Sequence, residues 1–189
     1  MNFKYLTIEN GLSQSTAAAI YQDSRGYIWI GTNEGLNRYN GFEIKVYKSD
    51  KYKKGSIVNN YILSLQEDNS NNLWVGTNKG ISKINLKTDE ITNFECDENG
   101  NPFYKVRSIL LTERGTLIVI TQKNVYLYDE KNNKFTVALH EQEIFKTEDI
   151  VDIKEDKSSN IWVGTTKSLI KVDRNTKEII QYYSDDSGS

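Results

Sequence analysis

The sequence contains few of the residues that most often take part in catalysis, metal binding or disulfide formation. It has one cysteine, Cys96, one histidine, His140, and one proline, Pro102. A lone cysteine excludes an internal disulfide and a cysteine-rich zinc site, and a lone histidine excludes mechanisms that need two imidazoles. We therefore expect no metal, no cofactor and no catalysis by this chain. Cys96 is interpreted as an inert thiol and His140 as a solvated loop residue.

The chain also lacks long apolar runs and a strong excess of charge of either sign. No run approaches the roughly 18 residues that span a bilayer, and the first residues do not resemble a signal peptide. Lys and Arg together number 24 and Asp and Glu 26, for a net charge of -2. Such a balance supplies no strong field for a phosphate backbone. We expect no nucleic-acid binding and no direct membrane insertion of this chain.

An internal repeat dominates what is present. The strings WIGTNEGLNRY, WVGTNKGISKI, IVITQKNVYLY and WVGTTKSLIKV begin at Trp29, Trp74, Ile118 and Trp162, with spacings of 45, 44 and 44 residues. Six residues before these anchors stand Asp23, Asp68, Thr112 and Asp156, and two residues after them Gly31, Gly76, Ile120 and Gly164. Short alternating apolar runs separated by Asn- and Gly-rich turns are typical of antiparallel strands.

Four-stranded units of this period predict a β-propeller. We expect an all-β propeller fragment with four blades of four antiparallel strands and a repeat period of 44–45 residues. The blades are expected at about 16–47, 61–94, 105–139 and 149–183, with an extra N-terminal strand at 3–8. Asn40–Gly41 predicts a two-residue turn in the first blade. The extra strand suggests an incomplete ring that self-associates through its terminal blades; a closed four-bladed ring is the alternative.

The repeated side chains are expected to be structural. The tryptophans, with Ile118 in the third copy, should fill the wedge between adjacent blades. The aspartates should accept backbone N–H groups in their own turns, rather than form a carboxylate ring or a calcium site. The threonines that end each second strand are expected to make turn hydrogen bonds, rather than line a pocket; they are Thr32, Thr77, Thr121 and Thr165.

The string DSRGYIWIGTNEGLNRY resembles the two-component regulator propeller repeat, and GLSQSTAAAIYQD resembles the usual start of such a propeller. The third copy departs most from the pattern, at Thr112, Ile118 and Ile120. The resemblance implies an extracytoplasmic sensory part of a membrane receptor whose output is a histidine kinase or a diguanylate cyclase. It also implies that the chain has no catalytic role of its own and that a saccharide is a plausible ligand.

Ligand contacts are expected on loops, since binding residues gather on loops over a rigid scaffold. In a four-stranded meander, the loops between strands two and three share a face with the linkers between blades. The residues of these loops are Asn33, Glu34, Asn78, Lys79, Gln122, Lys123, Thr166 and Lys167, and the linkers 48–60, 95–105 and 140–148 lie beside them. The alternative function is a scaffold that mediates dimerisation and relays a signal without binding a small molecule.

Overall fold

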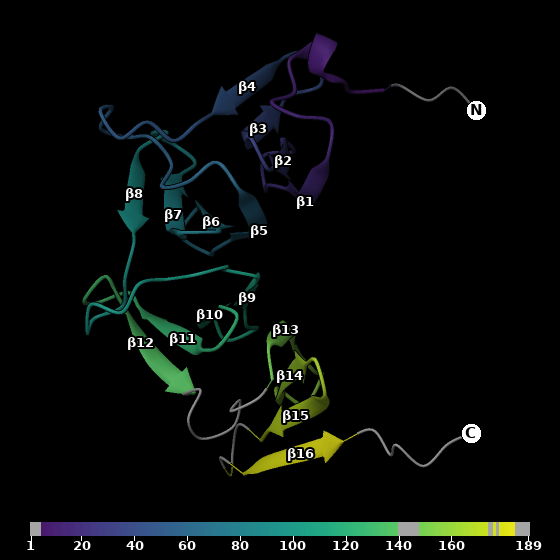
Figure 1. Ribbon diagram of the computed structural model, residues 1–189, viewed down its shortest axis with the longest axis vertical. Coiled ribbons are helices and arrows are strands. Elements are labelled where there is room, and N and C mark those ends of the chain that lie inside the picture. Colours follow the sequence, from purple (N-terminus) through teal and green to yellow (C-terminus); the bar gives the residue numbers. More distant parts are fainter. Residues whose placement is uncertain (1–4, 140–147, 174–175, 177, 184–189) are drawn as a thin grey trace. The chain divides into compact units, whose positions relative to one another are not determined.

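The computed structural model describes residues 5–139, 148–173, 176 and 178–183 (Figure 1). Its described residues form sixteen strands in four antiparallel sheets, and in every sheet the strands pair in sequence order. This meander arises because short strands are joined by tight turns. The predicted all-β fold with four four-stranded blades is therefore confirmed. The chain divides into two compact units, Met1–Val106 and Arg107–Ser189, which are described separately.

The first unit contains two blades. The first blade is built of β1 (Ala17–Gln22), β2 (Ile28–Thr32), β3 (Gly35–Tyr39) and β4 (Ile44–Tyr47). The second is built of β5 (Ile62–Glu67), β6 (Asn72–Thr77), β7 (Gly80–Asn85) and β8 (Ile91–Phe94). A 3-10 turn, η1 (Ile8–Asn10), precedes them.

The second unit contains the other two blades. The third blade is built of β9 (Ser108–Leu111), β10 (Leu117–Ile120), β11 (Val125–Asp129) and β12 (Lys134–Leu139). The fourth is built of β13 (Ile150–Glu155), β14 (Ile161–Thr165), β15 (Ser168–Val172) and β16 (Ile179–Tyr183).

Two local predictions were wrong. Of the strand expected at 3–8, residues 3 and 4 lie outside the described residues, 5–7 have no regular structure, and Ile8 begins η1. The Asn10 side chain favours this turn because it accepts hydrogen bonds from both the backbone N–H and the hydroxyl of Thr7, each at 3.0 Å. The expected two-residue turn at Asn40–Gly41 is a four-residue loop, since Tyr39 pairs with Ile44. There the Asn40 side chain accepts two backbone N–H groups, an Asx turn.

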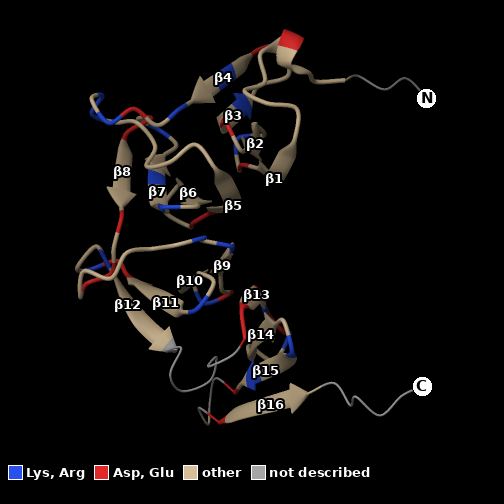
Figure 2. Ribbon diagram, in the orientation of Figure 1, with Lys and Arg blue, Asp and Glu red and all other residues tan. Residues whose placement is uncertain are grey.

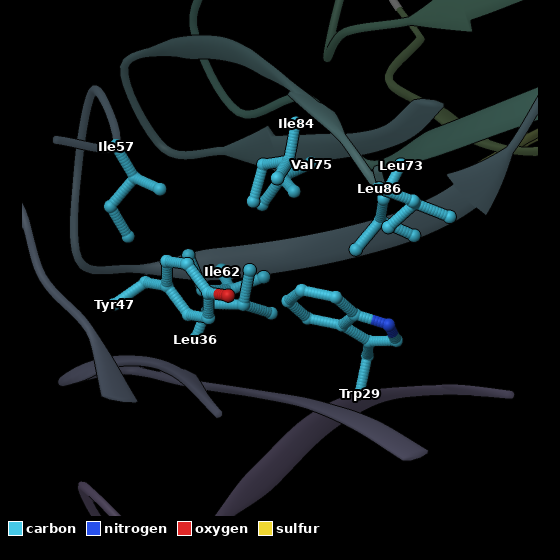
Figure 3. Packing of buried hydrophobic residues seen from close by; sticks show 9 residues of the cluster. All are labelled: Trp29, Leu36, Tyr47, Ile57, Ile62, Leu73, Val75, Ile84 and Leu86. Atoms are coloured by element: carbon cyan, nitrogen blue, oxygen red, sulfur yellow. The ribbon is translucent and has the colours of Figure 1, made fainter. Parts of the chain in front are cut away.

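Each unit has a core between its two sheets. In the first unit the core gathers side chains of both blades around the fully buried Trp29 and includes Ile57 of the β4–β5 linker (Figure 3). In the second unit the core is aliphatic and is centred on Ile118, Ile120, Ile150 and Ile153. Stacked blades thus bury sheet faces that a single four-stranded sheet would leave in water.

Candidate functional site

The repeated aspartate organises the turn between the first two strands of a blade. In the first blade, Asp23 Oδ1 accepts the backbone N–H groups of Arg25 and Tyr27, each at 3.0 Å. Its other oxygen, Oδ2, accepts the indole N–H of Trp29 at 2.9 Å. The predicted turn role is confirmed, and the bond to the tryptophan six residues later is a feature that the sequence reasoning missed.

The second and fourth blades repeat this geometry. Trp74 donates its indole N–H to Asp68 at 2.7 Å, and Trp162 donates to Asp156 at 2.8 Å. Both carboxylates also accept two backbone N–H groups of their own turns. These aspartates are therefore engaged in hydrogen bonds within their own turns, as in the first blade.

The hydrogen bonds shift the acidity of two of these carboxylates. Burial raises the pKa of Asp23, but hydrogen bonds from Trp29 and Arg25 outweigh it, so the pKa lies below its ordinary value. Hydrogen bonds from Trp162 and Asn160 hold the pKa of Asp156 well below its ordinary value. Both carboxylates are consequently charged at neutral pH.

Two of the three signature glycines, Gly31 and Gly76, allow a neighbouring segment of the chain to approach closely. A Cβ built on Gly31 would lie 2.6 Å from Ile62 Cγ2, and one on Gly76 would lie 2.7 Å from Val106 Cγ1. A Cβ on Gly164 would meet nothing closer than 3.9 Å. Gly31 and Gly76 are therefore required for close packing inside the first unit.

The threonine series is structural, as predicted. The hydroxyls of Thr32, Thr77 and Thr165 each donate to the carbonyl three residues later, at distances of 2.8–3.0 Å. The same oxygens accept the N–H groups of the loop. Thr121 makes a longer bond of the same kind, at 3.4 Å. These hydroxyls close the loops between strands two and three and are engaged there.

The eight predicted ligand residues fall into two sets, one in each unit. In the first unit, Asn78 joins two linkers, because its N–H donates to the Tyr61 carbonyl at 3.0 Å and its carbonyl accepts the Lys105 N–H at 3.2 Å. Lys79 is exposed beside it. Asn33 is half-buried and Glu34 is exposed.

In the second unit, three of the predicted residues meet around Asp149. The Gln122 side chain donates to the Asp149 carboxylate at 2.7 Å, and the Lys123 ammonium lies 3.3 Å from it. These contacts lower the pKa of Asp149, the Gln122 bond most. The Thr166 N–H donates to the Asp149 carbonyl at 3.0 Å, whereas Lys167 is exposed. Most of the 140–148 linker and His140 lie outside the described residues.

A pocket of about 510 Å³ lies on the linker side of the first unit. Its walls are linker residues 49–51 and 53–58, Lys79, and three residues in and after β8, Ile91, Asn93 and Glu95. Ligand pockets usually enclose about 300–1,000 Å³, so this one is large enough for a small molecule. Of the predicted residues, it includes Lys79. The linker 48–60 was expected beside these loops, but its lysines were not named as ligand residues, although the charge run KSDKYKK at 48–54 indicates them.

Other kinds of site receive no support from the described part of the chain. Within those residues, no group of three or more His, Cys, Asp or Glu side chains is placed to hold a metal ion. Cys96 is exposed. Among the residues that the structure covers, no helix combines the length and apolarity needed to cross a bilayer.

Comparison with known proteins finds a family model that matches two of these repeats. The sequence model described as "Two component regulator propeller" matches residues 11–34 and 56–79. The matched residues fall in the first two of the four repeats. A segment of 55 residues, 29% of the chain, is 42% identical to Histidine kinase P4 of Formosa agariphila. That segment corresponds to 4% of the kinase.

Solved structures share the fold. The extracellular domain of a candidate one component system of B. thetaiotaomicron matches 92% of the chain with a TM-score of 0.71 and 19% identity. The extracellular domain of a candidate hybrid two component system of the same organism matches 95% with a TM-score of 0.65 and 21% identity. The chain spans 25% and 32% of these two structures. A streptogramin B lyase matches 87% of the chain, with a TM-score of 0.66 and 13% identity, so the fold by itself does not specify function.

Proposed function

We propose that this chain is a sensory, ligand-binding propeller segment of the extracytoplasmic part of a membrane signalling receptor of the two-component type. The observation that carries the proposal is the match of residues 11–34 and 56–79 to the two-component regulator propeller model. A 55-residue segment that is 42% identical to a histidine kinase supports it. In this proposal the chain recognises a ligand, and a separate output domain performs the catalysis.

The distribution of engaged and exposed side chains supports a recognition role on the linker side. At the opposite end of three of the four blades, the aspartate of the turn accepts hydrogen bonds from its own turn. On the linker side, the pocket of about 510 Å³ is walled by residues that differ from blade to blade. A stereotyped scaffold with variable loops at one end is the usual layout of a binding module.

A thermal-shift screen with saccharides and cell-wall fragments tests the proposal. A ligand that binds only the folded state raises the melting midpoint, and the rise saturates with ligand concentration. A saturable rise supports sensing by this chain. A screen in which no member gives a saturable rise would remove the support for a ligand-binding role.

A second candidate function is self-association, and one exposed residue favours it. Ile20 of β1 is 70% exposed, whereas its counterparts Leu65 and Ile153 pack against the preceding blade of their own unit. Exposed apolar surface of this kind favours association. The surface that would cover Ile20 is a further blade of the same repeat type, supplied by a second copy of the chain.

Light scattering distinguishes this scaffold role from a monomeric sensor. Association through the β1 face predicts a mass above 21.8 kDa that falls to the monomer value in an Ile20→Lys variant. A monodisperse monomer at high concentration argues against association and leaves the sensory role in place.

A further inference from the structure

The linker that walls the pocket is held in place by named contacts. Ile57 is 1% exposed and belongs to the core of the first unit. The neighbouring Val58 N–H donates to the Ser82 hydroxyl at 2.9 Å, and Asn93 donates to the Ser56 carbonyl at 2.9 Å. The pocket is therefore a built feature of the second blade, fixed on β7 and β8.

The neutral polar groups around the pocket are already used to hold this linker. The Ser49 hydroxyl donates to the Val58 carbonyl at 3.2 Å, and the Ser56 hydroxyl donates to the Asp50 carbonyl at 2.8 Å. Asn93 accepts the Ser82 hydroxyl at 2.7 Å. A ligand consequently finds few uncommitted neutral hydrogen-bonding groups there.

The charged groups differ from the neutral ones. Four lysines, Lys51, Lys53, Lys54 and Lys79, line the pocket, against Asp50 and Glu95. Figure 2 shows the blue of Lys and Arg along the linker that follows β4. Within the described residues, none of the four forms an ion pair, whereas nearby Lys45 pairs with Asp89 at 2.9 Å. The Asp50 carboxylate accepts the backbone N–H of Tyr52 at 2.9 Å. The pocket thus concentrates positive charge in a chain whose net charge is -2.

We propose that this pocket binds a small anionic ligand, one that carries a carboxylate, sulfate or phosphate group, through Lys53, Lys79 and the neighbouring linker lysines. Ammonium groups that converge on one anion make charge-assisted hydrogen bonds, which are stronger than neutral ones. Val58 and Ile91 provide apolar wall for the uncharged part of the ligand. The proposal rests on the sensory role proposed above and specifies the class of ligand.

The test uses four probes on the 189-residue chain: glucose, glucuronate, glucose 6-sulfate and inorganic sulfate. Binding is followed by melting midpoint and by calorimetric titration. The variant Lys53→Glu/Lys79→Glu reverses two exposed pocket charges. Lys87→Glu/Lys157→Glu makes the same charge change at exposed positions outside the pocket. Circular dichroism confirms that both variants are folded.

We expect at least one anionic probe to bind saturably, glucose not to bind, and the pocket variant to lose affinity by about tenfold or more per reversed lysine. The control variant should keep its affinity within about twofold, and added salt should weaken binding because it screens exposed charges. Inorganic sulfate binding as tightly as glucose 6-sulfate identifies a free anion as the ligand; a clear preference for either charged sugar identifies an acidic saccharide.

Two results overturn the inference. One is the absence of saturable binding by every anionic probe, and the other is anion binding that the pocket variant retains. If the saccharide screen yields a neutral ligand while no anion binds, the inference fails and the sensory role stands. If neither the screen nor the anions give binding, the sensory role loses its support as well.

Discussion

The two units fill the space between their two blades with different side chains. In the first unit, Trp29 fills the space between two blades, and its indole N–H is satisfied by Asp23. In the second unit, Ile118 stands at the same repeat position in an aliphatic core. The third copy has Thr112 where the others have aspartate, and the Thr112 hydroxyl still accepts a turn N–H, from Thr116, at 3.0 Å.

The difference indicates that aspartate, tryptophan and glycine act as a set. A buried indole N–H needs an acceptor, and the carboxylate supplies it. Isoleucine has no such group, so a threonine suffices for the turn. The third copy also replaces the close-approach glycine with Ile120, which is fully buried against the fourth blade. The three positions therefore change together within one copy.

The largest expected effect concerns Trp29, the tryptophan buried between the two blades of the first unit. Trp29→Ala should lower the free energy of unfolding by about 3–5 kcal/mol, since it empties a fully buried site. Trp162 is only half-buried in the fourth blade, so Trp162→Ala should lower the free energy of unfolding by about 1–2 kcal/mol. Denaturant titration followed by circular dichroism measures both. Equal losses of stability in the two variants would show that the difference in burial between Trp29 and Trp162 does not affect the free energy of unfolding.

The next effect concerns the close approach at glycine. Gly31→Ala should cost about 1–3 kcal/mol, because the added methyl would overlap Ile62. Gly164→Ala is the matched control and should change stability by less than about 0.5 kcal/mol, since a Cβ there meets only an ordinary contact. Thermal melts of the two variants rank them, and a Gly164→Ala effect as large as that of Gly31→Ala would refute the packing role.

A smaller effect concerns a hydrogen bond between blades. Glu67 of the second blade is largely buried and accepts the N–H and hydroxyl of Ser24 in the first blade, at 2.7 and 2.6 Å. Glu155 accepts the Glu113 N–H at 2.7 Å in the second unit, at a more exposed position. Glu67→Ala should cost about 1–2 kcal/mol and Glu155→Ala less than about 1. The reverse order in denaturant titrations would contradict this account.

The smallest predicted effect is a pH dependence. The folded pKa of Asp156 lies below the unfolded value of about 3.9, so its charge stabilises the fold above that value and this contribution is lost as the pH falls. The stability difference between the natural chain and Asp156→Asn should therefore shrink between about pH 5 and about pH 2. A Thr112→Val variant, which has no titrating group at this position, is the control. A difference that stays constant with pH would count against the charged role.

Much of the fold could be predicted from the sequence, because a repeat shows the same constraint four times. The register of Trp29, Trp74, Ile118 and Trp162 located all four blades. The errors fell where the repeat gave no information. The segment 3–8 alternates like a strand, yet the side chain of Asn10 favours a local turn. Asn40–Gly41 suggests a tight hairpin, yet the Asn40 side chain captures two backbone N–H groups and lengthens the loop.

The candidate site was predictable only in part. The topology of a meander places Lys79 beside the inter-blade linker, and the structure has it in the pocket wall. The path of residues 48–60 follows no repeat, because that linker is longer than its counterparts and is fixed by Ser82 and Asn93 of another strand pair. No local sequence pattern predicts such long-range contacts.

The central claim is that the signature residues hold the blades while the linker pocket of the first unit recognises the ligand. It is tested most directly by the ligand-induced rise in melting midpoint of two variants. Trp162→Ala should melt lower than the natural chain but keep the rise, and Lys53→Glu/Lys79→Glu should melt normally but lose it. A rise lost in Trp162→Ala and retained in the lysine variant would contradict the claim.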